Sequence, residues 1–320
     1  MTILNDVGKL VIDDKQLESY FASKDLSEHT KIKSPSNYGD EVLDYLRNDM
    51  EGGIPLPFFY SEDKFKIRMG ETTIVSGYSG HGKTAWLSYV IGKILQEHKC
   101  LIASFEMLPK ATLGRMMLQC HGLSPTDSAV FDFVKKLDGK LYLYDAEGET
   151  TTDKIKTVLY YAKEKLGVEI FVIDSLMKCG INEDDYNRQK KFVNELCVAS
   201  RDTGIHIFLV AHSRKGLDEN REPSKFDVLG SSNITNLADN CITVFRNKKK
   251  EAVMESQDQA KMDEAMNWYD CKVYINKQRH GNGYEGNFGL YFDKQTFTYL
   301  EKNNANQRLY QGNKKEFLKR

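Results

Sequence analysis

The sequence has no excess of either charge. Its 45 lysines and arginines are balanced by 46 aspartates and glutamates, so the formal net charge of the 320 residues is −1. This balance excludes a uniformly basic nucleic-acid-binding protein. It leaves room for a local basic strip, because binding to phosphates depends on where the charges lie.

Long apolar runs and paired cysteines are also missing. No run reaches the roughly 18 apolar residues needed to cross a bilayer, and the first residues, MTILNDVGKLVIDDKQ, lack the apolar core of a signal peptide. The six cysteines are scattered, form no CxxC pair and mostly adjoin apolar segments, which predicts buried reduced thiols. We therefore expect a cytoplasmic protein that does not span a membrane.

The patterning divides the chain into three parts. These are an N-terminal segment with a linker helix over residues 1–52, a core domain over 53–302 and a basic tail over 303–320. The helix is predicted within GDEVLDYLRNDM, where Val42, Leu43, Tyr45 and Leu46 recur at helical spacing. The glycines and prolines of the following EGGIPLPFF end it.

From Glu71 onward, apolar strands alternate with amphipathic helices. The strands are expected at 72–77, 100–106, 140–145, 168–174 and 205–212, and the helices at 83–98, 110–122, 151–167 and 187–204. Apolar runs that each lead into a helix are typical of a parallel sheet covered on both faces, so the predicted fold is α/β with a mainly parallel central sheet.

Beyond Asp239 the pattern changes to short strand-like segments, NCITVFRN, CKVYINKQR, FGLYFD and TFTYL. These predict an antiparallel extension of the sheet. The charged stretch at 248–268 between the first two is expected to be an exposed helix or loop.

The stretch GYSGHGKT satisfies the pattern G-x-x-x-x-G-K-[ST] through Gly77, Gly82, Lys83 and Thr84. It stands between an expected strand and an expected helix, as a phosphate-binding loop requires. Backbone N–H groups would surround the β-phosphate, Lys83 would reach the β and γ oxygens, and the Thr84 hydroxyl would coordinate Mg²⁺. Gly80 within the loop and Ala85 after it are further expected nucleotide contacts, so the loop predicts a nucleoside triphosphate site.

Two acidic residues follow buried strands. Asp174 ends IFVID, which suits a carboxylate that holds Mg²⁺ through water. Glu106 ends the strand after the phosphate-loop helix and faces the same crevice. The pattern alone leaves two interpretations of Glu106 open: a base that orients and deprotonates the attacking water, or an acid favoured by the dipole of the next helix.

His212 ends the strand LVAH, where a polar side chain can contact the γ-phosphate. The polar loop after it carries four cations, Arg214, Lys215, Arg221 and Lys225. A loop of this length in a compact domain is often functional, but the residues by themselves favour a solvated surface loop.

The order of these motifs resembles one family. GYSGHGKT, SFEM, FVIDSL, LVAHSRK, VLGSSNITNLADNCITVFRNKK and INKQRHGNGYEGNFGLYFD follow one another over roughly residues 50 to 300. The set resembles the RecA-like motor domain of the DnaB family of hexameric replicative helicases, and within it the Twinkle and phage primase-helicase branch.

The resemblance implies a role for each matching residue at the nucleotide site. Glu106 would be the catalytic base, Asp174 the Mg²⁺-linked acid and His212 the sensor of the γ-phosphate. Lys277 and Arg279 match the basic pair that enters the neighbouring subunit's nucleotide site, with Arg279 as the arginine finger.

Two further matches concern the base of the nucleotide and the DNA. Arg246 and Phe292 match positions that flank the nucleotide base. The loop with Arg214, Lys215, Arg221 and Lys225 matches the loop that grips single-stranded DNA. Six such loops in a ring would supply many cations to one DNA backbone although each subunit is nearly neutral.

The resemblance therefore implies a homohexamer that uses ATP or dTTP with Mg²⁺ and unwinds forked DNA beside primase, polymerase or loader partners. If the source is viral, it would act in the host cytoplasm or nucleoid.

The sequence also departs from the family pattern. Ser175 stands where the family usually has a tyrosine, and no primase segment or N-terminal collar is recognised. Residues 38–50 would be either a linker helix docked on the adjacent subunit or a helix packed on its own domain. A DNA-coating recombinase ATPase and a helicase loader without unwinding activity are the alternatives.

Overall fold

The computed structural model describes residues 33–49, 52–145, 150–176, 179, 181, 185–212, 222, 232–256 and 258–303. The chain divides into two units, residues 1–51 and residues 52–320. None of the helices in these described ranges is long and apolar enough to cross a membrane.

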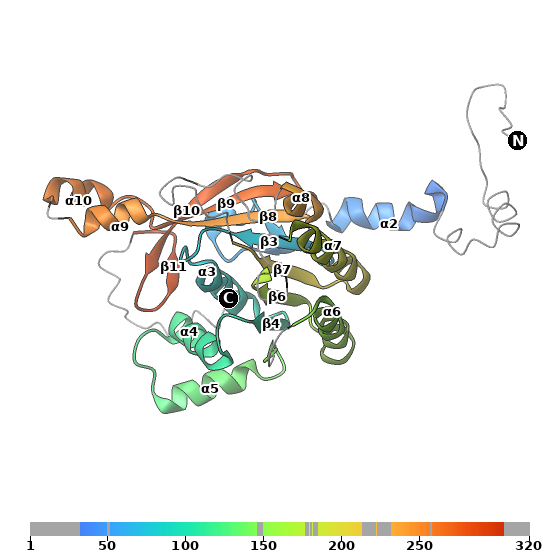
Figure 1. Cartoon of the computed structure of the whole chain (residues 1–320), viewed down its shortest axis with the longest axis horizontal. Helices are drawn as coiled ribbons and strands as arrows, with labels where there is room; N and C mark the ends of the chain where they lie inside the picture. The colour runs from blue at the N-terminus through green and yellow to red at the C-terminus, as the bar shows by residue number, and fades with distance from the viewer. Residues whose placement is uncertain are drawn as a thin grey trace, which may run out of the picture. The chain divides into compact units, whose positions relative to one another are not determined.

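The second unit is built around a nine-stranded sheet with the order β11-β10-β9-β8-β3-β7-β6-β4-β5 (Figure 1). Its strands are β3 (Thr72–Ser76), β4 (Cys100–Ser104), β5 (Leu141–Leu143), β6 (Ile170–Asp174), β7 (His206–Val210), β8 (Asn240–Arg246), β9 (Cys271–Gln278), β10 (Gly286–Asp293) and β11 (Thr298–Leu300). A separate antiparallel pair joins β1 (Ile54–Pro55) to β2 (Lys66–Ile67).

The parallel part of the sheet extends one strand further than the sequence predicts. β8 pairs in parallel with β3, with Ile74 opposite Cys241, so it does not belong to the antiparallel extension. Residues 211–239 separate β7 from β8, and a connection of that length can return the chain to start a parallel strand. Among the described strands of this sheet, antiparallel pairing begins at β9 and continues through β10 to β11.

Helices cover both faces of this sheet because successive strand residues point to opposite sides. Along β3, Ile74 belongs to one buried apolar cluster and Val75 to the other. The cluster with Val75 includes side chains of α3 (Lys83–Ile94), α4 (Pro109–His121) and α5 (Asp127–Leu137). The cluster with Ile74 includes side chains of α6 (Thr152–Tyr161), α7 (Tyr186–Thr203) and α8 (Ser232–Leu237).

Three helices have local causes in the sequence. The hydroxyl of Thr126 accepts a hydrogen bond from Ala129 N and starts α5, a helix that the sequence reading does not predict. The charged stretch after β8 forms two short helices, α9 (Lys248–Met254) and α10 (Gln259–Ala265), drawn in orange at the end of β8 in Figure 1. Side chains of Asn247 and Asp258 cap them.

The described part of the first unit is one helical segment. It comprises a 3₁₀ turn (Pro35–Tyr38), α2 (Gly39–Asp44) and a π turn (Tyr45–Asp49). Val42, Leu43 and Leu46 are about half exposed. A helix therefore forms where the sequence predicts one, and these three apolar side chains are exposed.

Candidate functional site

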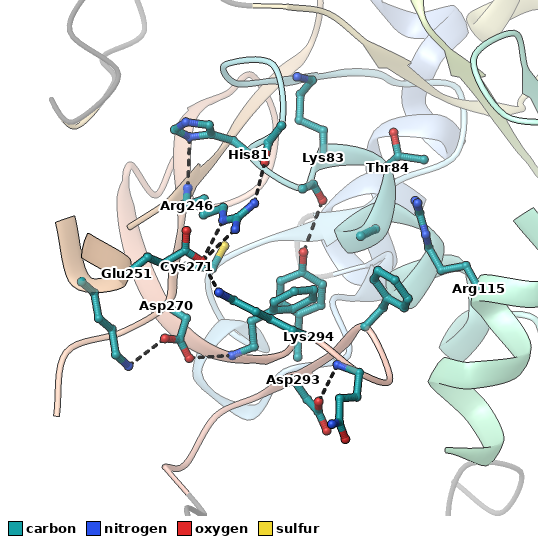
Figure 2. Close-up of a pocket in the computed structure, with 18 of the residues that line it drawn as sticks. His81, Lys83, Thr84, Arg115, Arg246, Glu251, Asp270, Cys271, Asp293 and Lys294 are labelled. Atoms are coloured by element: carbon teal, nitrogen blue, oxygen red, sulfur yellow. Dashed lines mark hydrogen bonds and ion pairs between the residues drawn. The ribbon is translucent and has the colours of Figure 1, made fainter. Parts of the chain in front are cut away.

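A cavity of about 850 Å³ opens beside the phosphate loop, at the edge where the parallel strands end (Figure 2). Most of the residues expected to bind nucleotide line it: Gly80, Gly82, Lys83, Thr84, Ala85, Glu106, Asp174, His212, Arg246 and Phe292. They come from separate segments of the chain, which meet because the carboxyl ends of parallel strands share one edge.

The phosphate loop depends on its glycines. Gly77 has φ +147°, and a Cβ there would lie 2.4 Å from the backbone oxygen of Val244, which leaves no room for a side chain. Gly80 and Gly82 also have positive φ values, of +76° and +85°. The loop therefore runs tightly around the amino end of α3.

Lys83 occupies the centre of this loop. Its Nζ donates hydrogen bonds of 2.9 Å to the backbone oxygens of Gly77 and Tyr78 and lies 3.4 Å from Nδ1 of His212. The side chain is buried, and burial lowers the pKa of its amine to about 8, against the opposing effects of Asp174 and Glu106. A phosphate entering the loop would find this cation already oriented.

Thr84 and Asp174 form the second feature of the site. The Thr84 hydroxyl donates a hydrogen bond of 2.7 Å to Oδ2 of Asp174. The other oxygen, Oδ1, is buried and has no hydrogen-bond partner within the described structure, and burial raises the pKa of the carboxyl group. A hard cation that prefers oxygen ligands would satisfy this oxygen, so the pair fits Mg²⁺.

Among the described residues, no three His, Cys, Asp or Glu side chains come together as a metal site. A Mg²⁺ ion here would therefore depend on phosphate and water oxygens besides Thr84 and Asp174. That is the ligand set Mg²⁺ has in many nucleotide sites.

Glu106 is held by two donors. Its Oε1 accepts a hydrogen bond of 2.7 Å from the Ser175 hydroxyl and one of 3.3 Å from Nε2 of His212. These bonds, with His212 as the larger cause, lower the pKa of the carboxyl group to about 2. His212 thus lies between Lys83 and Glu106 and contacts both, and Ser175 is a site residue that the sequence reading noted only as a departure.

The other end of the cavity is aromatic. Phe292 packs against Tyr299 at 4.9 Å and against Phe297 at 6.4 Å between ring centroids. Arg246 lines the same cavity. Its Nη1 donates a hydrogen bond of 3.3 Å to the backbone oxygen of Gly80, and its Nε and Nη2 contact Glu251 at 3.0 and 2.8 Å (Figure 2). The flat ring of a nucleotide base would fit against these aromatic side chains, and the ion pair with Glu251 holds the Arg246 guanidinium in the same cavity.

Arg115 also lines the cavity, although its sequence context does not predict a site residue. It projects from α4 into the cavity, and its guanidinium lies 5.3 Å from the ring centre of Phe297 (Figure 2). No sequence signal marks it, because an arginine on a partly polar helix usually faces solvent.

Lys277 and Arg279 lie outside this cavity. β9 runs antiparallel to β8, with Cys271 opposite Arg246 and Gln278 opposite Asn240, which places the end of β9 at the other edge of the sheet. Lys277 Nζ donates to the backbone oxygens of Thr235, Asn236 and Ala238, at the end of α8. Both cations are therefore far from the phosphate loop of their own chain.

The expected DNA-contacting residues, Arg214, Lys215, Arg221 and Lys225, lie outside the described residues. Their role stays a prediction.

Comparison with known proteins identifies matches over most of the chain. The family model of the DnaB-like helicase C terminal domain matches residues 66–301. A DNA helicase/primase of Enterobacteria phage T3 is 24% identical over 121 residues, which are 35% of this chain and 21% of that protein. The match thus spans about a fifth of the length of that curated relative.

Two solved structures share the fold. One, of a DnaB-like replicative helicase studied for its interactions with primase, has a TM-score of 0.68 at 16% identity and covers 89% of this chain and 73% of its own. The other, a structure of an ATPase domain, has a TM-score of 0.67 at 15% identity and covers 91% of this chain and 100% of its own. These likenesses confirm the expected RecA-like α/β fold with a mainly parallel sheet.

Proposed function

The chain belongs to the DnaB-like helicase C-terminal domain family, and on that premise we propose that it is the NTP-driven motor of a replicative DNA helicase. The observation that carries the proposal is the meeting of Lys83, Thr84, Asp174, Glu106 and His212 around one cavity. These groups can supply what nucleotide hydrolysis needs: a cation that binds phosphate, a pair that binds a metal ion, a carboxylate that can activate water and a group that can sense the γ-phosphate.

The proposed reaction is hydrolysis of the β–γ bond of ATP or dTTP. Lys83 binds the β and γ oxygens. Thr84 and Asp174 would hold Mg²⁺, which would neutralise part of the phosphate charge. Glu106 accepts the proton of the attacking water, whose oxygen bonds to the γ-phosphorus as the bond to the β-phosphate oxygen breaks. A γ-phosphate that draws the hydrogen bond of His212 away from Glu106 would make Glu106 a stronger base.

We further propose that the catalytic site is shared between neighbouring subunits of a ring, as a hexamer. Six strand positions separate Arg246, at the cavity, from Asn240, beside Gln278; at about 3.3 Å per residue, this is about 20 Å. Arg279 is therefore too distant to serve its own cavity, and this supports a role as arginine finger toward the next subunit.

The exposed Val42, Leu43 and Leu46 of the N-terminal helical segment support docking on an adjacent subunit. The ring would carry single-stranded DNA in its channel, gripped by Arg214, Lys215, Arg221 and Lys225. It would act in the cytoplasm or nucleoid with primase, polymerase or loader partners.

The test is nucleotide hydrolysis with and without single-stranded DNA. We expect DNA to stimulate hydrolysis, and we expect Arg279→Ala to lower the rate by on the order of 100-fold or more while nucleotide still binds. A hydrolysis rate that single-stranded DNA does not change would favour a helicase loader instead. Full activity of Arg279→Ala in the assembled protein would contradict the shared site.

A further inference from the structure

The two carboxylate oxygens of Asp239 hold two different elements at the edge of the sheet opposite the cavity. Oδ2 accepts a hydrogen bond of 3.0 Å from the backbone N–H of Thr72, at the start of β3. Oδ1 accepts one of 2.8 Å from Nη1 of Arg279. The backbones of Asp239 and Arg279 are joined as well, through a hydrogen bond of 2.9 Å from Arg279 N to Asp239 O.

The carboxylate of Asp239 is buried, so its charge must be compensated by neighbouring groups. The side chain of Asp239 is only 5% exposed, whereas that of Arg279 is 38% exposed. A buried carboxylate needs a cation and hydrogen bonds to offset its lost hydration, and Asp239 obtains both from Arg279 and the Thr72 N–H. The guanidinium is therefore held on its buried side and open to solvent on the other.

The anchoring leaves Arg279 with unused donors. A guanidinium has five N–H groups. Nη1 uses one on Asp239, and Nη2 contacts the backbone oxygens of Asn236 and Leu237 at 2.9 and 3.4 Å. Three of the five are thus engaged within the described structure, and two remain for an oxygen from outside the chain.

Lys277 provides the contrast. An ammonium group has three N–H donors, and Nζ of Lys277 gives hydrogen bonds of 2.8, 3.1 and 2.6 Å to three carbonyls at the end of α8. Lys277 thereby ties down the same carbonyl cluster that Arg279 contacts through Asn236 O. In this arrangement Arg279, and not Lys277, can reach for a phosphate.

We propose that Asp239 is a positioning residue that holds Arg279 ready to enter the neighbouring subunit's nucleotide site. This inference rests on the proposed function, in which Arg279 acts on the next subunit. An arginine side chain that is held in place before the phosphate arrives loses little conformational entropy when the site closes. Its N–H donors can therefore act fully on the transition state. Because Asp239 also binds the start of β3, the finger is positioned relative to the strand that leads into its own phosphate loop at Gly77.

The decisive experiment is complementation in mixed assemblies. Asp239→Asn should damage only the finger that a subunit gives to its neighbour, and Glu106→Gln only the subunit's own pocket. Each variant alone should hydrolyse NTP at least about tenfold more slowly than the unaltered protein. Co-assembled in equal amounts, they should regain activity, because about a quarter of the interfaces then join an intact pocket to an intact finger.

A mixture of Arg279→Ala with Glu106→Gln is the reference. If that mixture recovers activity and the Asp239→Asn mixture does not, Asp239 has a structural role only and the proposal fails. If neither recovers, the shared site fails, and with it this part of the proposed function. Wild-type activity, or faster hydrolysis, of Asp239→Asn alone would also overturn the proposal.

A double-mutant cycle gives an independent readout. If Asp239 acts through Arg279, adding Asp239→Asn to Arg279→Ala should not slow hydrolysis further, whereas additive losses would contradict the proposal. Asp202→Asn, which changes an exposed carboxylate on α7, is the matched control and should leave the rate unchanged. If Asp239→Asn does not assemble, Asp239→Ser replaces it. Failure of both to assemble would mark Asp239 as structural and overturn the proposal.

Discussion

Thr84 and Asp174 lie 90 residues apart in the sequence, yet the hydroxyl of one donates a hydrogen bond of 2.7 Å to the carboxylate of the other. The second oxygen of Asp174 is buried and has no hydrogen-bond partner among the described residues. The site thus presents an oxygen that a metal ion bound with nucleotide would satisfy.

The first prediction concerns this pair. Asp174→Asn keeps the shape of the side chain and can still accept a hydrogen bond from Thr84, but it loses the negative charge that would hold Mg²⁺. We expect NTP hydrolysis to fall by on the order of 100-fold and the Mg²⁺ concentration for half-maximal rate to rise. A Mg²⁺ titration of the hydrolysis rate measures both. Thr84→Ser keeps the hydroxyl and should remain near wild type; an unchanged titration for Asp174→Asn would exclude Asp174 from the metal site.

The second prediction compares two glycines of the phosphate loop. An alanine at Gly77 would meet the backbone oxygen of Val244 at 2.4 Å, whereas a Cβ at Gly80 would meet no atom within 4 Å. We expect Gly77→Ala to abolish nucleotide binding and to lower the free energy of unfolding by about 2 kcal/mol or more. Gly80→Ala should cost about 1 kcal/mol, from its positive φ alone. Thermal unfolding and nucleotide titration report the two effects, and equal behaviour of both variants would argue against the crowded turn at Gly77.

The third prediction concerns Arg115, whose guanidinium lines the cavity beside Phe297. Its removal should weaken nucleotide binding, since a phosphate or base loses a nearby cation. We expect Arg115→Ala to raise KM for the nucleotide by about tenfold, which is about 1.4 kcal/mol. Lys110→Ala removes an exposed cation from the same helix and should leave KM unchanged. If both variants behave alike, Arg115 does not contact nucleotide.

The fourth prediction is a loss of stability in acid. His206 is fully buried, donates through Nδ1 to the backbone oxygen of Arg68 and accepts at Nε2 from the Thr73 hydroxyl. Burial lowers the pKa of its imidazole from 6.5 to about 4. The unfolded chain therefore binds a proton more readily, and the stability present above pH 6.5 is lost as the pH falls toward 4.

The expected loss from His206 between pH 7 and pH 4 is about 3 kcal/mol in the free energy of unfolding. Denaturant unfolding at several pH values measures it. His206→Asn, which keeps a donor near Nδ1, should flatten the dependence by that amount. His280→Asn, at an exposed histidine, controls for the loss of any imidazole. An equally steep pH dependence in His206→Asn would refute the assignment.

The sequence predicts the parallel sheet and the phosphate site well, because both depend on local patterns. The apolar runs around Ile74 and Val172 are continuous, as strands covered on both faces require. Gly77, Gly82, Lys83 and Thr84 stand at fixed spacing in one loop, and Asp174 ends a buried strand.

Features that depend on strand pairing or on contacts between distant residues cannot be predicted from local sequence patterns. The strand direction of β8 follows from a long connection and not from its own residues, so the segment around Ile242 looks the same in either orientation. Arg115 and Phe297 meet from distant parts of the chain, and neither carries a local signal. For α5 a signal does exist, in the Thr126 cap and the apolar spacing of Ala129, Phe133 and Leu137.

The central claim is that this chain couples nucleotide hydrolysis to unwinding. Strand displacement on a forked DNA duplex tests it most directly, with a hydrolysable triphosphate, a non-hydrolysable analogue and Glu106→Gln. The glutamine can still accept hydrogen bonds from Ser175 and His212 but cannot take the proton of water. The account predicts displacement only with the hydrolysable triphosphate and none with Glu106→Gln. DNA binding with nucleotide hydrolysis but no displacement would contradict it and favour a DNA-coating ATPase.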